Sequence, residues 1–298
     1  MKTFEELLSR AKSVTPKTVA VADIEEEVLI ALDEANKKIG MNAFLIGNVD
    51  DVKKIASSNN VDLSKYELVN EPDQNKALRL SVRMVKEGKA DILMKGLVQT
   101  SAFMRAVLDK EDGLVGDRFL SHFALFQIPL YHKLLAVTDV AINIAPNLEE
   151  KAKIIENAVY VFKKLSDETP LVACLAAVER VNPVKMPATE DAAILSKMAE
   201  RGQIKNCIVD GPLAFDNCIS MESVRIKKIK SKVAGNADII LCPNIETGNA
   251  LYKCLNDFAQ AKCAAIVAGA KAPIVLTSRA DTHETKFLSI VLASLTSN

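Results

Sequence analysis

The sequence predicts an α/β protein with largely parallel sheets. Short runs of β-branched and apolar residues alternate along the chain with longer amphipathic stretches, which is the pattern of repeated strand–helix units. Several of the short runs are nearly all apolar, as expected of strands whose two faces are both covered by helices. The 298 residues, 49% of them hydrophobic, suit a single large α/β domain or two halves.

Ten segments are expected to form strands, because each is a short apolar run bounded by turn residues. They are Thr18–Ala22, Ala43–Gly47, Asp91–Met94, Phe123–Gln127, Leu135–Thr138, Leu171–Ala176, Cys207–Asp210, Asp238–Cys242, Ala264–Val267 and Pro273–Thr277.

Capping residues mark the ends of the expected helices. The stretch Glu25–Lys38 places apolar side chains on one face and is followed by Gly40, a suitable C-cap. A helix after Asn147 has an acidic residue three positions beyond its cap and ends near Leu165. Residues Glu179–Ala188, with two prolines, are expected to form a crossing or lid segment. The remaining helices are expected from Asp73 to Glu87, from Thr189 to about Gly202 and from Thr282 to Leu295.

The composition excludes several classes of protein. Lys and Arg number 38, as do Asp and Glu, so the net charge gives no sign of a nucleic-acid or membrane partner. An anionic ligand must therefore be held by local cations or helix N-termini. The six cysteines form no C-x-x-C pair and are expected to be buried free thiols. Because no signal peptide and no run of ~18 apolar residues is visible, we expect a cytoplasmic protein.

Polar residues follow five of the predicted strands. In open parallel sheets, ligands bind beyond the carboxyl ends of the strands, so these residues are the candidate site. Turn chemistry alone explains each motif, and it is their joint placement on one edge that favours a site. They are Lys95-Gly96 with Thr100, Ser101 and Arg105; Asp139 and Asn143; Asp210-Gly211-Pro212 with Phe215 and Asp216; Pro243 to Asn249; and Thr277 to Asp281.

Standard cofactor signatures are missing from the sequence. There is no G-x-G-x-x-G, no P-loop and no H-E-x-x-H, so neither a dinucleotide nor a metal site is predicted. Of the three histidines, His122 and His132 flank apolar strands and are expected to be structural, and His283 alone is near a candidate site.

An ordered series of motifs resembles the phosphate acetyl/butyryl transferase family over nearly the whole chain. Its downstream members are Asp210 to Asp216, Val233 to Asp238, Pro243 to Lys253 and Leu276 to Arg279. Its upstream members resemble the butyryl branch; they are Leu93 to Thr100 with Phe103 and Arg105, Tyr131 to Lys133, Asn143 to Leu148, Val181 to Pro183 and Lys185 to Thr189.

The resemblance implies a fold like that of isocitrate and isopropylmalate dehydrogenases. In that fold two α/β domains with largely parallel sheets enclose a cleft that holds the active site. The corresponding division here is a first domain of residues 1–144 completed by 266–298, with residues 145–265 inserted as a second domain.

The resemblance also implies a direct exchange, in which acyl-CoA and phosphate give acyl phosphate and CoA. Two anions must approach one carbonyl, so positioning and charge neutralisation are expected to dominate catalysis. Arg279 is then the phosphate clamp and Ser278 the hydrogen-bond donor to the thioester or its oxyanion. Lys95, Gly96, Thr100 and Arg105 complete the expected phosphate site, although Arg105 could instead form a surface ion pair with Asp109.

Formation of acyl-CoA needs a thiolate, and a base would assist. The acetyl branch carries an acidic residue farther along the last helix, where this chain has Thr285. The candidates here are Asp281, Glu284 and His283. Asp281 could equally be the N-cap of that helix, and the two roles can coexist. No cysteine follows a nucleophile pattern, so an acyl-cysteine intermediate is not expected.

Coenzyme A is expected to lie over the inserted domain, as a substrate beside phosphate, with no resident cofactor. Its expected neighbours are Asp210, Gly211, Pro212, Phe215, Glu246, Thr247, Gly248 and Asn249. The resemblance also implies a homo-oligomer, a dimer or larger. Three alternatives stay open: a phosphate acetyltransferase, a non-catalytic acyl-CoA-sensing domain, and a metal-dependent decarboxylating dehydrogenase, which would need a carboxylate cluster that the sequence lacks.

Overall fold

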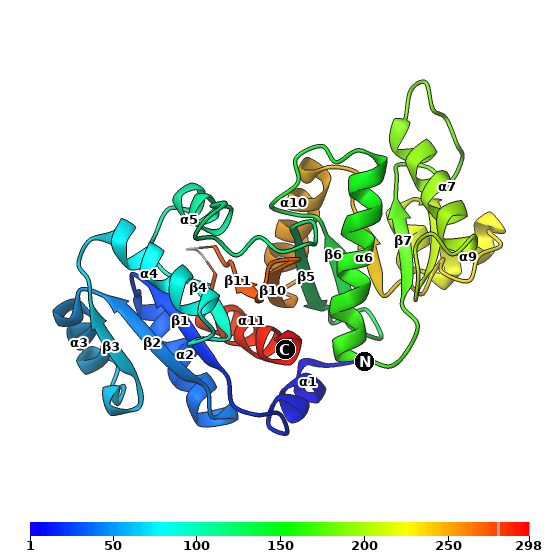
Figure 1. The fold of residues 1–298 in the computed structure, drawn as a ribbon. Helices are drawn as coiled ribbons and strands as arrows, with labels where there is room; N and C mark the ends of the chain where they lie inside the picture. Colours follow the sequence, from blue (N-terminus) through cyan, green and yellow to red (C-terminus); the bar gives the residue numbers. More distant parts are fainter. Residues whose placement is uncertain (279–280, 298) are drawn as a thin grey trace. The chain divides into compact units, whose positions relative to one another are not determined.

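A computed structural model describes residues 1–278 and 281–297. The chain forms two compact units, each with its own α/β core (Figure 1). The terminal unit comprises Phe4–Arg118 and Ala264–Asn298, and the middle unit comprises Met1–Thr3 and Phe119–Cys263.

The boundaries of the middle unit differ from the expected ones. The inserted domain was expected to span residues 145–265, and the middle unit spans Phe119–Cys263. The structure assigns Ser121–Gln127 (β5) and Leu135–Thr138 (β6) to the middle unit. The reason is strand pairing, because β6 pairs in parallel with Ile239–Leu241 (β9) and β5 pairs with β6. The middle unit therefore begins at Phe119.

The sheet of the terminal unit has the strand order β3-β2-β1-β4-β11-β10. All neighbours pair in parallel except β10 and β11, so the carboxyl ends of β1 to β4 and β11 share one edge. In Figure 1, α4 (cyan) lies across the face of β1 and β2. The strands are Thr18–Ala22 (β1), Asn42–Gly47 (β2), Glu67–Asn70 (β3), Ile92–Lys95 (β4), Lys262–Ala268 (β10) and Ile274–Val275 (β11). The helices are Phe4–Ala11 (α1), Glu26–Ile39 (α2), Val49–Ser58 (α3), the 3-10 turn Leu63–Lys65, Gln74–Lys86 (α4), Thr100–Val107 (α5) and His283–Thr296 (α11).

The sheet of the middle unit has the order β5-β6-β9-β7-β8, and only β5 runs antiparallel to its neighbour. The carboxyl ends of β6, β7, β8 and β9 therefore share an edge. Its two further strands are Leu171–Leu175 (β7) and Ile208–Leu213 (β8). Its helices are Leu148–Leu165 (α6), Pro187–Glu200 (α7), Phe215–Ile219 (α8), Met221–Lys227 (α9), Ile245–Lys253 (α10) and a π-turn at Cys254–Phe258.

Local sequence explains where the principal helices begin and end. Gly40 ends α2 in the left-handed conformation at φ 69°, which glycine adopts without a Cβ penalty. Asn147 begins α6 through a capping box, in which its side chain accepts from the N–H of Glu150 and the Glu150 side chain accepts in return. Asp73 caps α4 by accepting from two backbone N–H groups.

Candidate functional site

The edge of the terminal unit's sheet reverses its strand order between β1 and β4. This is the topological switch point at which open α/β sheets bind ligands. The loops after these two strands pack tightly: a Cβ on Gly96 would lie 2.0 Å from the carbonyl oxygen of Asp23. The N–H of Leu97 donates to that same oxygen at 2.7 Å. Glycine at position 96 therefore allows close backbone packing at the switch point.

Lys95, the last residue of β4, is buried beneath its own loop. Lys95 is only 3% exposed. Its ammonium donates to the carbonyls of Gly96 at 3.1 Å and Val98 at 3.4 Å. These two bonds help to hold the loop, and the role of Lys95 as a phosphate ligand stays a prediction. Thr100, at the start of α5, is exposed.

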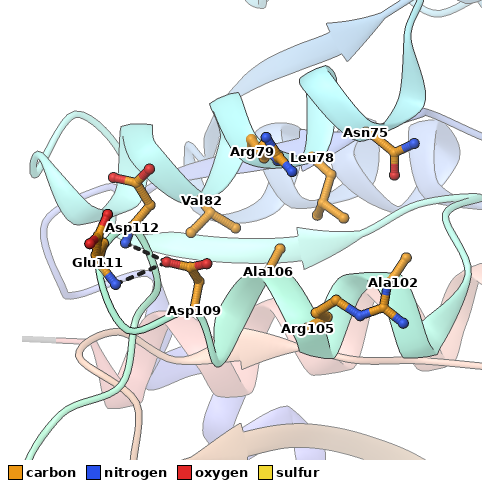
Figure 2. A pocket seen from close by; sticks show the side chains of 10 residues that line it. All are labelled: Asn75, Leu78, Arg79, Val82, Ala102, Arg105, Ala106, Asp109, Glu111 and Asp112. Atoms are coloured by element: carbon orange, nitrogen blue, oxygen red, sulfur yellow. Dashed lines mark hydrogen bonds between the residues drawn. The ribbon is translucent and has the colours of Figure 1, made fainter.

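Arg105 lines a cavity of about 270 Å³ between α4 and α5. Figure 2 shows its guanidinium extending toward Ala102 and away from Asp109. The Asp109 carboxylate instead accepts from the N–H groups of Glu111 and Asp112, which lower the pKa of Asp109. The alternative role of Arg105, an ion pair with Asp109, is not seen in the described part of the chain, where the guanidinium points away from that carboxylate.

Ser278 lies in a tight turn after β11, beside β4 at the same sheet edge. Ser278 is exposed, and its N–H donates to Oδ2 of Asp281 at 2.7 Å. In return, the N–H of Asp281 donates to the carbonyl of Ser278 at 3.2 Å. These reciprocal bonds fix both ends of the turn. Arg279, the expected phosphate clamp, lies outside the described residues.

The candidate bases have different surroundings. Thr282, not Asp281, caps α11, because its hydroxyl oxygen accepts the N–H of Thr285. The alternative in which Asp281 is the N-cap of α11 is therefore wrong. The Asp281 carboxylate accepts the Ser278 N–H instead. His283 contacts Glu27 through its ring, at 3.3 Å, and through its backbone N–H. Glu284 is exposed in the first turn of α11.

A buried lysine in α11, missed by the sequence analysis, reaches this turn. Lys286 is 1% exposed and contacts Glu25 together with the carbonyls of Ser278 and Asp281. The signal was present in the sequence, since Lys286 is the one lysine or arginine of α11 and directly precedes the apolar run that begins at Phe287. A charged residue on such a helix is buried only with partners.

In the middle unit, the first turn of α10 carries the second group of candidates. Asn244 caps the helix by accepting from Thr247, and Glu246 is exposed. A Cβ on Gly248 would lie 2.1 Å from the carbonyl oxygen of Asp139. Gly248 therefore packs α10 onto the loop after β6, and the amide of Asn249 donates to Val140 in that loop.

Asp139 anchors the loop after β6, a role the sequence did not reveal. It is 3% exposed, and its carboxylate accepts from the N–H groups of His122, Ala141 and Ile142 and from the Asn143 amide. Four donors satisfy this buried charge. Asp139 thus fixes the backbone against which α10 begins.

Asp210, Gly211 and Pro212 were expected near the end of a strand and in the loop after it. In the structure all three lie within β8. The pairing with β7 continues to Leu213 across a register shift, so the strand runs past the Asp-Gly-Pro motif. A Cβ on Gly211 would lie 2.7 Å from that of Cys174, which gives this glycine a packing role. Phe215 is half-buried at the start of α8.

Four of the six thiols have a raised pKa and are poor nucleophiles. Burial raises the pKa of Cys242, at the end of β9, to about 12 and that of Cys207 to about 11. Burial also raises the pKa of Cys174 and Cys218. These four thiols are therefore neutral near pH 7 and supply no thiolate for an acyl-cysteine intermediate.

Residues 1–278 and 281–297, as far as their side chains and helices are described, hold neither a cluster of metal ligands nor a membrane-spanning helix. They contain no group of three or more His, Cys, Asp or Glu residues placed to hold a metal ion. They also contain no helix long and apolar enough to span a membrane.

The strand order and the switch point define a doubly wound α/β protein, a fold that solved phosphotransacylase structures share. A branched-chain phosphotransacylase from Enterococcus faecalis has the same fold, with a TM-score of 0.82 and 33% identity over 94% of this chain and 98% of that one. The family model "Phosphate acetyl/butaryl transferase" matches residues 73–294, and the chain belongs to that family. The family predicted from the motifs is thus confirmed.

Relatives of both branches align over nearly the full length. A phosphate butyryltransferase of Clostridium acetobutylicum is 48% identical over 99% of this chain and 98% of its own. A phosphate acetyltransferase of Rickettsia typhi is 42% identical over 100% of this chain and 85% of its own.

Proposed function

We propose that this protein transfers a short acyl group of the butyryl type between coenzyme A and inorganic phosphate. The reaction is butyryl-CoA plus phosphate giving butyryl phosphate plus CoA, by direct displacement. The observation that carries the proposal is the full-length similarity to a phosphate butyryltransferase, at 48% identity, combined with an exposed serine at the switch-point edge. The 42% identity to a phosphate acetyltransferase is lower and covers less of that relative.

In the proposed reaction a phosphate oxygen attacks the thioester carbonyl, and the C–S bond breaks as the new C–O bond is completed. Ser278, whose N–H is held by Asp281, would donate a hydrogen bond from its hydroxyl to the carbonyl oxygen as negative charge develops there, and CoA would leave as the thiolate. Arg279, the next residue, would hold two phosphate oxygens with its planar guanidinium. Arg105 at the α5 cavity, together with Lys95, Gly96 and Thr100, would add to the anion site.

In the reverse direction CoA must lose its thiol proton before its sulfur attacks the acyl phosphate. Asp281 is the base in this proposal, because its carboxylate is fixed within one turn of Ser278 and is nearly buried. Accepting the Ser278 N–H orients the carboxylate. His283 and Glu284 are the alternatives, both on the more exposed first turn of α11.

The proposal includes coenzyme A bound over the middle unit, near Glu246 to Asn249 in the first turn of α10. The fixed loop at Asp139 would keep this turn in place. An isocitrate/isopropylmalate dehydrogenase-like arrangement, a cleft in which both substrates meet, a homo-oligomer and a cytoplasmic location belong to the same proposal.

The test is an assay of thiol release from acetyl-, propionyl-, butyryl- and isobutyryl-CoA, with and without phosphate. We expect phosphate-dependent release that is fastest with the four-carbon substrates. A preference for acetyl-CoA would indicate the acetyl branch, and release without phosphate would indicate a thioesterase. No release from any acyl-CoA would leave the acyl-CoA-sensing alternative.

Variants assign the roles of the serine–arginine pair. Ser278→Ala should lower kcat about 100-fold, the usual cost of removing one oxyanion donor. Arg279→Lys should raise the phosphate KM because it loses the bidentate fork. The matched controls are Ser64→Ala and Arg201→Lys, exposed residues outside the site, which should leave both constants unchanged. Wild-type kinetics in Ser278→Ala would remove the serine from the mechanism.

A further inference from the structure

The buried charge on α11 is unexpected for a helix of this kind. From Thr285 to Thr296 every described residue of α11 is buried, and Lys286 is among the most buried, at 1% exposure. Removing an ammonium from water is unfavourable unless partners compensate. A methionine or leucine would pack at this position without that cost. The lysine therefore has a use that its packing does not explain.

The ammonium of Lys286 brings together three acceptors from separate segments. It lies 3.4 Å from Oε1 of Glu25, the residue that precedes α2. It donates to the carbonyl of Asp281 at 2.5 Å and reaches that of Ser278 at 3.5 Å. A lysine ammonium has three donors, so its capacity is matched by these acceptors.

Two of the three acceptors are the ends of the turn that carries the serine. The carboxylate of Asp281 holds the N–H of Ser278 from one side. Lys286 holds the carbonyls of the same two residues. The N–H of Ser278 and the carbonyls of Ser278 and Asp281 are thus all held by these two side chains.

The helix itself does not need this contact. Thr282 caps α11 by accepting the N–H of Thr285, independently of the lysine. The contacts of Lys286 are directed to the turn and to Glu25. A role in the turn accounts for the charge where a role in the helix does not.

We propose that Lys286 is a positioning residue for acyl transfer, one that holds the Ser278–Asp281 turn in its reactive arrangement. This inference rests on the proposed function. The serine must meet an oxyanion that exists only near the transition state, so a turn displaced by about 1 Å lowers kcat about 100-fold. Binding of acyl-CoA, which is assigned to the middle unit, should be little changed.

The test compares Lys286→Met, which keeps most of the length of the side chain and removes its charge, with Lys133→Met. Lys133 is a matched control, because its ammonium also contacts one carboxylate and one carbonyl, Asp238 at 2.7 Å and Asn236 at 2.8 Å. That ion pair precedes β9, at the strand end opposite to the candidate site. We expect Lys286→Met to lower kcat by about 30- to 100-fold with an acyl-CoA KM within about twofold of wild type. Lys133→Met should lose thermal stability and keep wild-type kcat.

The double variant Glu25→Gln/Lys286→Met separates positioning from simple charge neutralisation. It removes the carboxylate that Lys286→Met leaves without its cation, so it should recover thermal stability and also guard against misfolding of the single variant. If Lys286 positions the turn, kcat stays low in the double variant. Wild-type kcat in either variant would overturn the inference, since the lysine would then serve only to neutralise Glu25.

The inference and the proposed function fail in distinguishable ways. Phosphate-dependent CoA release by wild type and Lys133→Met, with unchanged kinetics in Lys286→Met, overturns the role of Lys286 alone. Absence of that release in wild type overturns the proposed function, and the role of Lys286 with it.

Discussion

The closest backbone approach at the switch point leads to a quantitative prediction for Gly96→Ala. The added Cβ would lie 2.0 Å from the carbonyl oxygen of Asp23 and 2.4 Å from that of Ala22. Ordinary contact begins at 3.4 Å, so the loops after β1 and β4 must separate by about 1.4 Å. Neither opposing atom is at the end of a flexible side chain that could move aside.

The magnitude follows from two costs. Inserting a methyl group into a packed region costs about 1–3 kcal/mol. Separation of the loops also breaks the 2.7 Å bond from the Leu97 N–H to the Asp23 oxygen, which adds about 1–2 kcal/mol. We therefore expect a loss of about 2–4 kcal/mol in the free energy of unfolding. Activity should fall about 100-fold, because a displacement near 1 Å at a reacting centre has that effect.

Gly47→Ala is the matched control, since Gly47 ends the neighbouring strand β2 at the same edge. Its added Cβ would lie 3.6 Å from the nearest atom, an ordinary contact. Urea unfolding and the CoA-release assay should show wild-type behaviour for Gly47→Ala and large losses for Gly96→Ala. Equal stability and equal kinetics for the two variants would refute the close-packing reasoning.

Three further predictions concern caps, buried charges and thiols. Thr282→Ala should lower the free energy of unfolding by about 1 kcal/mol through loss of the α11 cap. Asp281→Asn should chiefly flatten the pH dependence of CoA acylation. A larger loss of stability for Asp281→Asn than for Thr282→Ala would argue against this assignment. Asp139→Asn should cost about 2–4 kcal/mol in urea unfolding because an amide cannot accept all four of the present donors, and a loss below about 1 kcal/mol would contradict the anchoring role. Burial raises the pKa of Cys242 from 9.0 to about 12, so between these pH values the folded state keeps a proton that the unfolded state loses. The free energy of unfolding should therefore fall as pH rises above about 9, by up to about 1.4 kcal/mol per pH unit for this thiol. Cys242→Ala should reduce that alkaline slope, and Cys254→Ala, at an exposed position, should not.

The sequence predicted the apolar core strands well because their signal is local. Thr18–Ala22 and Leu135–Thr138 match β1 and β6 residue for residue. Strand β3, Glu67–Asn70, was missed because it is a half-exposed edge strand with only two apolar residues. The helix expected from Thr189 begins earlier, at Pro187, a residue favoured at the first position of a helix.

The candidate site was predicted less completely than the fold. Residues that follow strands could be found from the sequence, because the sheet edge gathers them. Partners that come from distant segments could not: Asp23 meets Gly96, and Glu25 meets Lys286, only through tertiary packing. The contacts of the Lys95 ammonium with the carbonyls of its own loop also depend on backbone geometry that no motif encodes.

The order of the strands has a consequence for biosynthesis. Strand β11 carries the serine turn and pairs with β4, yet the entire middle unit separates them along the polypeptide. During translation the ribosome releases residues 119–263 as one uninterrupted stretch, while the terminal sheet still lacks β11. The nascent enzyme therefore acquires its serine last, after its other half has had time to fold.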